Sequence, residues 1–330
     1  MTPAGPFLSI VLTGRNDDYG VDFRSRFFRT LQFNHRELTA RNVAHEFVFV
    51  EWAPPSERPL LVDLVLDTIP TLDTHCFRGY VVDRRYQEAL SLNPRLEYLE
   101  FLAKNVGIRR AGGRFILASN CDVFLSRGIL DQFEKGSLEH RTVYRAPRYD
   151  LKLTADQSRL DWDMLEDAGN LEARPPVLKP PLMGGGTGDF VLLDRETFHQ
   201  LRGFNEVYRV ARIGIDHNFL VKALSTGIRI ADIGAPVYHV NHPGSYRLSR
   251  TVYAGREAEA PWGNVRWHSR GVVYDNPPEW GLQGAPLQTV ERHGFLEFSW
   301  EAVPRLVDLR RVVLPVARIG FPYPGRYVEQ

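Results

Sequence analysis

Short apolar runs alternate with segments of helical periodicity over the first 120 residues of the chain. Apolar side chains dominate 7–13 and 46–52, and a run without polar alternation covers 115–118. Such runs are typical of parallel strands that are covered on both faces. Between the first two runs, apolar residues recur at helical spacing, as at Phe23 and Phe27. The order strand, helix, strand, helix predicts an α/β fold with a mostly parallel central sheet flanked by helices.

The pattern changes in the middle of the chain. The segment 150–181 is rich in charges and prolines, which predicts a long loop or flap between two halves. Beyond it we expect a strand at 190–193, a helix at 216–227 and a strand at 228–238. Further on the periodicity fades, which predicts an irregular C-terminal extension over 246–330 that packs on the core.

Composition and charge narrow the function classes. The chain is 43% hydrophobic and 25% charged, as in soluble globular proteins, and its formal net charge of +1 gives no general electrostatic reason to bind nucleic acid. Its first residues lack the pattern of a signal peptide, and no apolar run approaches the ~20 residues of a transmembrane helix. Two cysteines without a CxxC partner fit a reducing compartment, so we expect a cytoplasmic protein.

One C-terminal segment leaves membrane contact open. The residues 303–319 mix arginines with Leu and Val. This mixture is typical of an element that docks on the core, or of an amphipathic helix that lies on a membrane surface. Peripheral membrane contact is therefore an alternative to simple docking.

Polar residues follow the expected strand at 115–118. Asn120, Cys121 and Asp122 stand at its carboxyl end, where open α/β sheets bind their ligands. A carboxylate there suits Mg²⁺ or Mn²⁺ that holds a diphosphate. An ordinary β-turn that uses Asn and Asp is the alternative.

Glycines crowd the segment 183–189, which ends in Asp189 and precedes a strand. Glycine lets a backbone come close to a ligand. The segment lacks the Gly-Lys-Ser/Thr ending of a phosphate loop, and unlike a dinucleotide fingerprint it precedes its strand. It is either a wall facing the substrate, with Asp189 accepting hydrogen bonds from hydroxyl groups, or a flexible hinge.

Two further constellations carry candidate chemistry. Asp216 begins an expected helix, so it is either an N-cap or a general base that takes a proton from an attacking hydroxyl. His239 and His242 follow an expected strand three residues apart, so they either converge on one ion or have structural roles. Imidazole suits Mn²⁺ or another first-row metal better than Mg²⁺.

Taken together and in this order, these constellations resemble the GT-A-fold glycosyltransferases. The resemblance extends from Ser9 to about Ser245 and points to family 2 enzymes and to the C-terminal half of β-1,4-galactosyltransferase-like enzymes. The pattern Asn105-x-Gly-x-Arg109-x-Ala-x-Gly, followed by an apolar strand and an acidic motif, is similar to the family 2 core. Asn120 takes the place of the first Asp in the family's Asp-x-Asp motif.

The later motifs look like the galactosyltransferase group. Gly185 and Gly186 precede a strand, and Gly-Phe-Asn-Glu follows at 203–206. His239 and His242 match the positions at which that group supplies two further metal ligands.

The resemblance also implies a domain organisation. A glycosyltransferase domain would span 1–245, with a donor half at about 1–125 and an acceptor half at about 180–245. The remaining 246–330 match no pattern in these families.

The resemblance implies a hexosyltransferase of polysaccharide biosynthesis. It would move a sugar from a nucleoside diphosphate-sugar to a hydroxyl of a glycan or other glycoconjugate. Asp122, His239 and His242 would hold Mn²⁺ or Mg²⁺, and Asp216 would be the base of an inverting displacement. A retaining mechanism, which needs no such base, is the alternative. The residues implied to bind nucleotide and donor are Thr13, Arg15, Asp17, Glu51, Asn105, Arg109, Asn120 and Cys121. Those implied to face the acceptor or donor sugar are Gly185, Gly186 and Asp189.

Three positions depart from the family pattern. Asn120 stands for an Asp, Ile215 for a Glu, and Lys222 for an Arg. Asn120 and Ile215 favour a non-catalytic protein that binds a sugar nucleotide or a glycan. A sugar-nucleotidyltransferase is the other alternative, but it would need a basic glycine loop after the first strand, whereas 14–18 is acidic and poor in glycine.

Overall fold

The computed structural model describes the greater part of the chain. The described residues are 5–91, 96–152, 161–172, 177–206, 209, 214–242, 275–285, 287–290 and 295–298. The segment 303–319, for which we predicted core docking or membrane contact, lies outside the described residues. No helix in the described part of the chain is long and apolar enough to span a bilayer.

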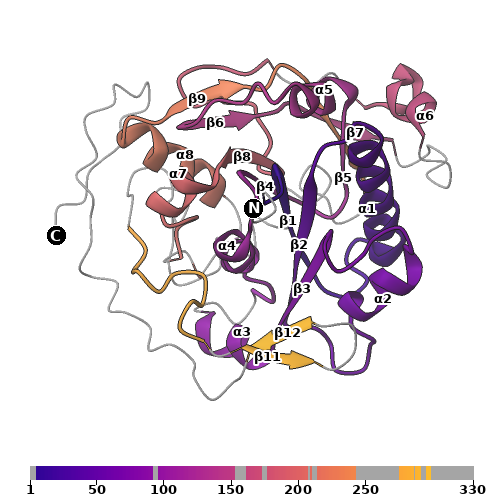
Figure 1. Cartoon of the computed structure of the whole chain (residues 1–330), viewed down its shortest axis with the longest axis vertical. Coiled ribbons are helices and arrows are strands. Elements are labelled where there is room, and N and C mark those ends of the chain that lie inside the picture. Colours follow the sequence, from indigo (N-terminus) through magenta and orange to yellow (C-terminus); the bar gives the residue numbers. More distant parts are fainter. Residues whose placement is uncertain are drawn as a thin grey trace.

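A mixed sheet of nine strands forms the centre of the molecule (Figure 1). Its order is β11-β12-β3-β2-β1-β4-β8-β6-β9. Strand β1 pairs in parallel with β2 and β4, β3 continues the parallel set, and β8 runs antiparallel between β4 and β6. The strand bounds are β1 Leu8–Gly14, β2 His45–Trp52, β3 Phe77–Val82, β4 Phe115–Ser119, β6 Thr142–Arg145, β8 Phe190–Asp194, β9 Arg229–Asp232, β11 Leu287–Val290 and β12 Phe295–Phe298.

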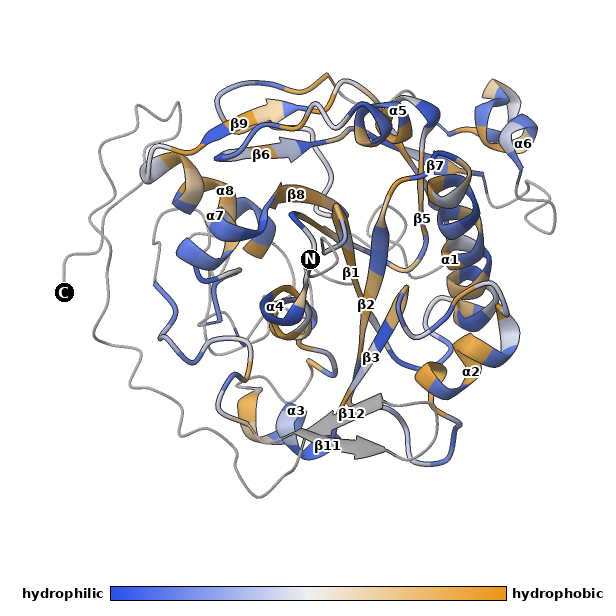
Figure 2. Cartoon of the chain, in the orientation of Figure 1, coloured by the Kyte–Doolittle hydropathy of each residue, from blue (hydrophilic) through white to orange (hydrophobic). Residues whose placement is uncertain are grey.

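Helices cover both faces of this sheet, which confirms the predicted α/β class. Helices α1 and α2 pack with alternate strand residues such as Ile10 and Phe49, whereas α4, α7 and α8 pack with the opposite set, such as Val11 and Val48. Figure 2 shows the hydrophobic residues gathered along the central strands. The helix bounds are α1 Phe23–Ala40, α2 Leu61–Thr68, α3 Arg84–Leu90, α4 Glu100–Arg110, α5 Arg127–Lys135, α6 Trp162–Glu166, α7 Arg195–Gln200 and α8 Ile215–Ser225.

A second, three-stranded sheet lies beside the carboxyl end of β4. It consists of β5 (Val123–Leu125), β10 (Val237–Val240) and β7 (Arg148–Leu151), in the order β5-β10-β7. Strand β10 pairs antiparallel with β5 and parallel with β7. This small sheet carries several of the side chains described below.

The strand predicted at 228–238 is wrong as a single element. The structure has two strands there, β9 and β10, which belong to different sheets. Gly234 between them has φ of +85°, a left-handed conformation that ends β9 and redirects the chain. The predicted flap at 150–181 also contains ordered pieces, namely the end of β7, helix α6 and a 3₁₀ turn at Ala168–Asn170.

Candidate metal centre

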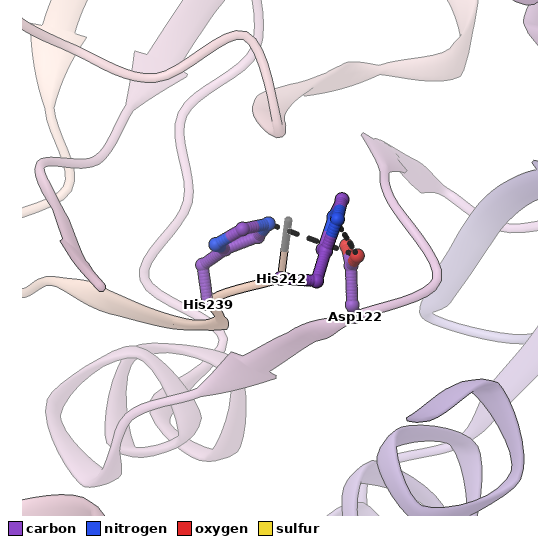
Figure 3. A group of neighbouring side chains, drawn as sticks. All are labelled: Asp122, His239 and His242. Atoms are coloured by element: carbon purple, nitrogen blue, oxygen red, sulfur yellow. Dashed lines mark ion pairs between the residues drawn. The ribbon is translucent and has the colours of Figure 1, made fainter. Parts of the chain in front are cut away.

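Three of the predicted side chains meet beyond the carboxyl end of β4. Asp122, His239 and His242 are buried, and one potential ligand atom from each lies within 4.8 Å of the others. The Asp122 Oδ2 atom is 3.3 Å from His242 Nε2 and 3.7 Å from His239 Nε2. Figure 3 shows the carboxylate beside the two imidazole rings. The arrangement provides one oxygen and two nitrogen donors that converge on a single place.

The register of the second sheet explains this convergence. Val123, which follows Asp122, pairs with His239 across β5 and β10, and Val240 donates a backbone hydrogen bond of 2.9 Å to the Asp122 carbonyl. His242 comes two residues after β10, and its backbone N–H is bound by the Asn241 side chain at 3.1 Å. The pairing of two strands far apart in sequence therefore creates the site.

The protonation states suit metal binding. Burial alone would raise the pKa of the Asp122 carboxyl, but the nearby His239, His242 and Arg26 outweigh it and hold this pKa well below its usual range. Burial lowers the pKa of His242, although Asp122 opposes this effect. An ionised carboxylate and a neutral imidazole are the forms that bind metals.

The donor set also fits a divalent cation. His242 turns Nε2 towards Asp122 Oδ2 at 3.3 Å, while its Nδ1 is buried against Gly20 and has no hydrogen-bond partner among the described residues. A set of one carboxylate and two imidazoles suits first-row metals such as Mn²⁺ better than Mg²⁺, which prefers oxygen ligands. The residues present are therefore compatible with the metal that the sequence resemblance implied.

A loop after β1 covers His242. The Tyr19 ring packs against the His242 ring at 5.1 Å and 73°. At Gly20, which has φ of +66°, an added Cβ would lie 2.1 Å from His242 Nδ1. The guanidinium of Arg26 binds the carbonyls of Tyr19 at 2.7 Å and Gly20 at 3.1 Å, and also that of Val21. Arg26 of α1 thus holds this loop against His242.

Sequence reasoning missed Arg26, whose Nε lies 3.9 Å from Asp122 Oδ2. A signal was present, because Arg26, Thr30 and Asn34 recur every four residues on a helix, each next to an apolar residue, and all three are buried. Asn34 holds β5 by bonds to Val123 and Leu125. This polar stripe on a buried helix face faces the small sheet.

Several predicted donor-binding residues lie at the same edge of the main sheet. The Thr13 hydroxyl bonds to the Tyr98 hydroxyl, and the Cys121 thiol donates to the Thr13 carbonyl at 3.4 Å. Arg15 is held by Asp17 at 2.6 Å and by the Glu97 carbonyl at 2.8 Å. These residues line the approach to the carboxyl end of β1.

Asn120 and Asp189 contact each other directly. The Asn120 amide nitrogen donates to Asp189 Oδ1 at 2.7 Å, and Lys104 donates to the Asn120 carbonyl oxygen at 2.8 Å. Asp189 also binds Thr187 and Arg148. Burial would raise the pKa of Asp189, but Arg148 and other cations outweigh it and lower the value to about 2.

The structure does not place Asn105 and Arg109 at the site. Asn105 is fully buried and binds the Phe204 backbone with both ends of its amide, at 2.8 Å each. Arg109 lies over the Trp280 ring at 4.8 Å and donates to the Pro278 carbonyl at 2.9 Å. Because α4 runs antiparallel to the strands, its C-terminal end reaches the amino edge of the sheet, away from the ligands. Both side chains therefore have partners within the protein, and their contacts with a nucleotide stay a prediction.

Glu51 has a structural role that the sequence did not reveal. Its two carboxylate oxygens accept backbone hydrogen bonds from Leu61 at 2.9 Å and Val62 at 3.0 Å, at the start of α2. The side chain is fully buried, and burial raises the pKa of Glu51 to about 7. We predicted a contact to the nucleotide base, but both oxygens of this carboxyl are occupied by the helix.

Asp216 lies beside the glycine segment. Helix α8 has Gly214 as its N-cap, so Asp216 is not the cap residue. Its Oδ2 is 3.6 Å from Arg145 Nη2, and a Cβ added to Gly188 would lie 3.0 Å from it. Arg145 also donates to the Gly186 carbonyl at 2.7 Å. The glycines therefore allow the segment to approach Asp216 and Arg145 closely, while Gly185 adopts φ of +101°.

The chain has structural but no sequence matches among known proteins. No protein-family model and no curated protein matches the chain. Among solved structures, the chain is similar to a mutant of Drosophila β1,4-galactosyltransferase 7 in complex with manganese, UDP-Gal and xylobiose, with a TM-score of 0.46, 12% identity, and coverage of 88% of this chain and 92% of the other. The catalytic domain of that enzyme with xylobiose gives a TM-score of 0.40 at the same identity and coverage. Similarity at this level does not assign an activity.

Proposed function

We propose that the protein is a metal-dependent glycosyltransferase of the GT-A type that uses a nucleoside diphosphate-sugar as donor. The observation that carries this proposal is the convergence of Asp122, His239 and His242 at the carboxyl edge of a mostly parallel sheet. That edge is where open α/β sheets bind nucleotides. The motif order in the sequence adds a second, independent line of support.

In this reaction the bond between the sugar and the diphosphate breaks, and a bond from the sugar to the acceptor oxygen forms. When bound, the divalent cation neutralises the diphosphate leaving group. Asp122, His239 and His242 would hold that cation, while Thr13, Arg15 and Asp17 would border the nucleotide. Asn120 and Asp189 contact the sugar, so they supply orientation.

Asp216 takes the proton of the acceptor hydroxyl, which gives inversion at the sugar carbon. Support comes from its position beside Gly188 and Arg145, where the glycine backbone packs closely against the carboxylate and a cation faces it. Its side chain is 22% exposed, so it can reach solvent and substrate. The acceptor is a carbohydrate or glycoconjugate, and the acceptor half of the domain lies at about 180–245.

The test measures the release of nucleoside diphosphate from UDP-, GDP- and dTDP-sugars with Mn²⁺. We expect activity in the wild type, its loss with EDTA and in Asp122→Ala, and normal activity in Asp67→Ala, an exposed aspartate at the end of α2. Asp216→Asn should bind donor without transferring sugar. Full activity of Asp122→Ala or insensitivity to EDTA would contradict the proposal.

The same assay separates the alternatives. A sugar-nucleotidyltransferase would release pyrophosphate from a nucleoside triphosphate and a sugar phosphate. A binding protein would be stabilised by a donor against heat without releasing any nucleotide. Either result would replace the transferase assignment.

A further inference from the structure

Strand β7 places a second carboxylate against the metal centre. In the parallel pairing of β7 with β10, Asp150 stands directly beside His239. Asp150 Oδ1 is 2.9 Å from His239 Nδ1, and both side chains are about 95% buried, with exposed fractions of 5% and 4%. No motif in the sequence pointed to Asp150, because it lies 89 residues from His239 in the chain.

The direction of this hydrogen bond follows from the chemistry of the two groups. A carboxylate can only accept, so the hydrogen must be on His239 Nδ1. In the neutral form of an imidazole the other nitrogen carries a lone pair, and the other nitrogen of His239, Nε2, is the atom that lies 3.7 Å from Asp122 Oδ2. A carboxylate behind a histidine fixes the tautomer and orientation that a metal ligand needs.

Arg148 holds Asp150 in turn. The two residues are two apart on β7, so their side chains share a face. Arg148 Nε is 3.1 Å from Asp150 Oδ1, and Arg148 Nη1 is paired with Asp189. Arg148 therefore connects the carboxylate behind His239 with the aspartate that ends the glycine segment.

We propose that Asp150 is a positioning residue for His239, and that by fixing its tautomer it sets the affinity of the centre for a divalent cation. Arg148 keeps Asp150 in place and links the centre to Asp189. The effect on affinity rests on the proposed metal-dependent function. The effect on the tautomer does not, because it exists in the metal-free protein.

The first measurement is the Mn²⁺ dissociation constant, read from the EPR signal of free Mn²⁺ in titrations of purified full-length protein. Loss of a carboxylate behind a metal-bound histidine weakens metal binding about 10- to 100-fold. We expect a loss in this range for Asp150→Ala and a smaller loss for Asp150→Asn, whose amide oxygen can still accept from His239. The control is Asp194→Asn, a buried aspartate that caps α7, which should leave Mn²⁺ binding unchanged.

The second measurement uses no metal. Long-range ¹H–¹⁵N NMR spectra distinguish the two tautomers of His239. The signals of His239 are assigned as those that are missing from the spectrum of His239→Gln. We expect the Nδ1–H form in the wild type and in Asp150→Asn, and a shift towards Nε2–H in Asp150→Ala. Circular dichroism shows whether each variant has folded. If Asp150→Ala does not fold, the Mn²⁺ affinity is tested with the conservative Asp150→Asn.

The outcomes separate the two hypotheses. An Nδ1–H tautomer that persists in Asp150→Ala, or Mn²⁺ affinities within twofold of the wild type in both variants, would overturn the role of Asp150. Absence of Mn²⁺ binding by the wild type would instead overturn the metal centre, while the NMR spectra would still decide whether Asp150 sets the tautomer.

Discussion

The side chain at position 120 fits the hydrogen-bonding groups of its two neighbours, Lys104 and Asp189. The sequence families that this chain resembles carry an aspartate at this position, yet the amide here has two specific partners. Its nitrogen donates to Asp189 at 2.7 Å, and its oxygen accepts from Lys104 at 2.8 Å. A carboxylate has no hydrogen to donate, so an aspartate at 120 would oppose Asp189 directly. The departure from the family pattern is thus matched to Asp189.

We predict that Asn120→Asp lowers the free energy of unfolding at pH 7 by about 1–3 kcal/mol, because a partly buried hydrogen bond becomes a contact between two carboxylates. Urea unfolding measures this loss. Two adjacent carboxylates raise the pKa of one of them, so the folded variant takes up a proton that the unfolded chain does not hold. The loss should therefore shrink as the pH falls from 7 to 5.

The exchanged pair supplies the control for this prediction. In Asn120→Asp combined with Asp189→Asn, one amide again faces one carboxylate, and Lys104 faces the new charge. The double variant should recover part of the stability lost by Asn120→Asp, which a double-mutant cycle would detect. Additive losses would show that the two side chains act independently.

At the scale of elements, the site depends on a loop and on a pairing that local patterns do not reveal. The loop after β1 has left-handed conformations at Asp18, Gly20, Val21 and Asp22, and Arg26 binds three of its carbonyls. A β-branched residue such as Val21 rarely adopts this conformation. The contacts to Arg26 hold the loop against His242.

Gly20→Ala tests the contact between this loop and the centre. The new Cβ would overlap His242 Nδ1, so the loop or the imidazole must move, and we expect Mn²⁺ affinity to fall at least about tenfold, as for other losses of ligand orientation. Gly136→Ala is the matched control, because Gly136 has a similar φ of +61° and no atom of the described residues lies within 4 Å of a Cβ added there. Both variants carry the backbone strain, about 1–2 kcal/mol. Equal Mn²⁺ affinities in the two variants would contradict the contact.

At the scale of the whole molecule, the two edges of the main sheet have different contacts. The carboxyl edge holds Asp122 and the loop after β1. At the amino edge, the turn after α4 bonds to Ser9 at the start of β1, with Gly113 donating at 2.7 Å. Arg109 stands near this end of α4 and contacts the segment 275–285. The sequence segment 105–122 therefore extends from the amino edge of the sheet, near Arg109, to its carboxyl edge, at Asp122.

Arg109→Ala distinguishes these two edges in solution. We expect unchanged Mn²⁺ affinity and donor turnover, but a lower free energy of unfolding by about 1 kcal/mol, because the contact with Trp280 is lost. Urea unfolding and the Mn²⁺ titration measure the two effects. A variant of normal stability that no longer binds donor would return Arg109 to the nucleotide site.

The sequence alone determined the class of fold and the positions of the candidate ligands. Strand and helix periods are local properties, and parallel strands gather their carboxyl ends at one edge, so Asp122 could be placed beside that edge from the pattern. The pairing partner of β10, the split at Gly234 and the contacts of Asp150 and Arg26 could not be predicted.

Tertiary structure decided what local patterns leave open. Strand register brings Asp150 to His239 across 89 residues, and the direction of α4 carries Arg109 to the edge away from the ligands. The buried Glu51 carboxylate accepts hydrogen bonds from the start of α2 with both of its oxygens. These outcomes depend on which distant surfaces pack together, a choice made by the free energy of the whole core and not by any one segment.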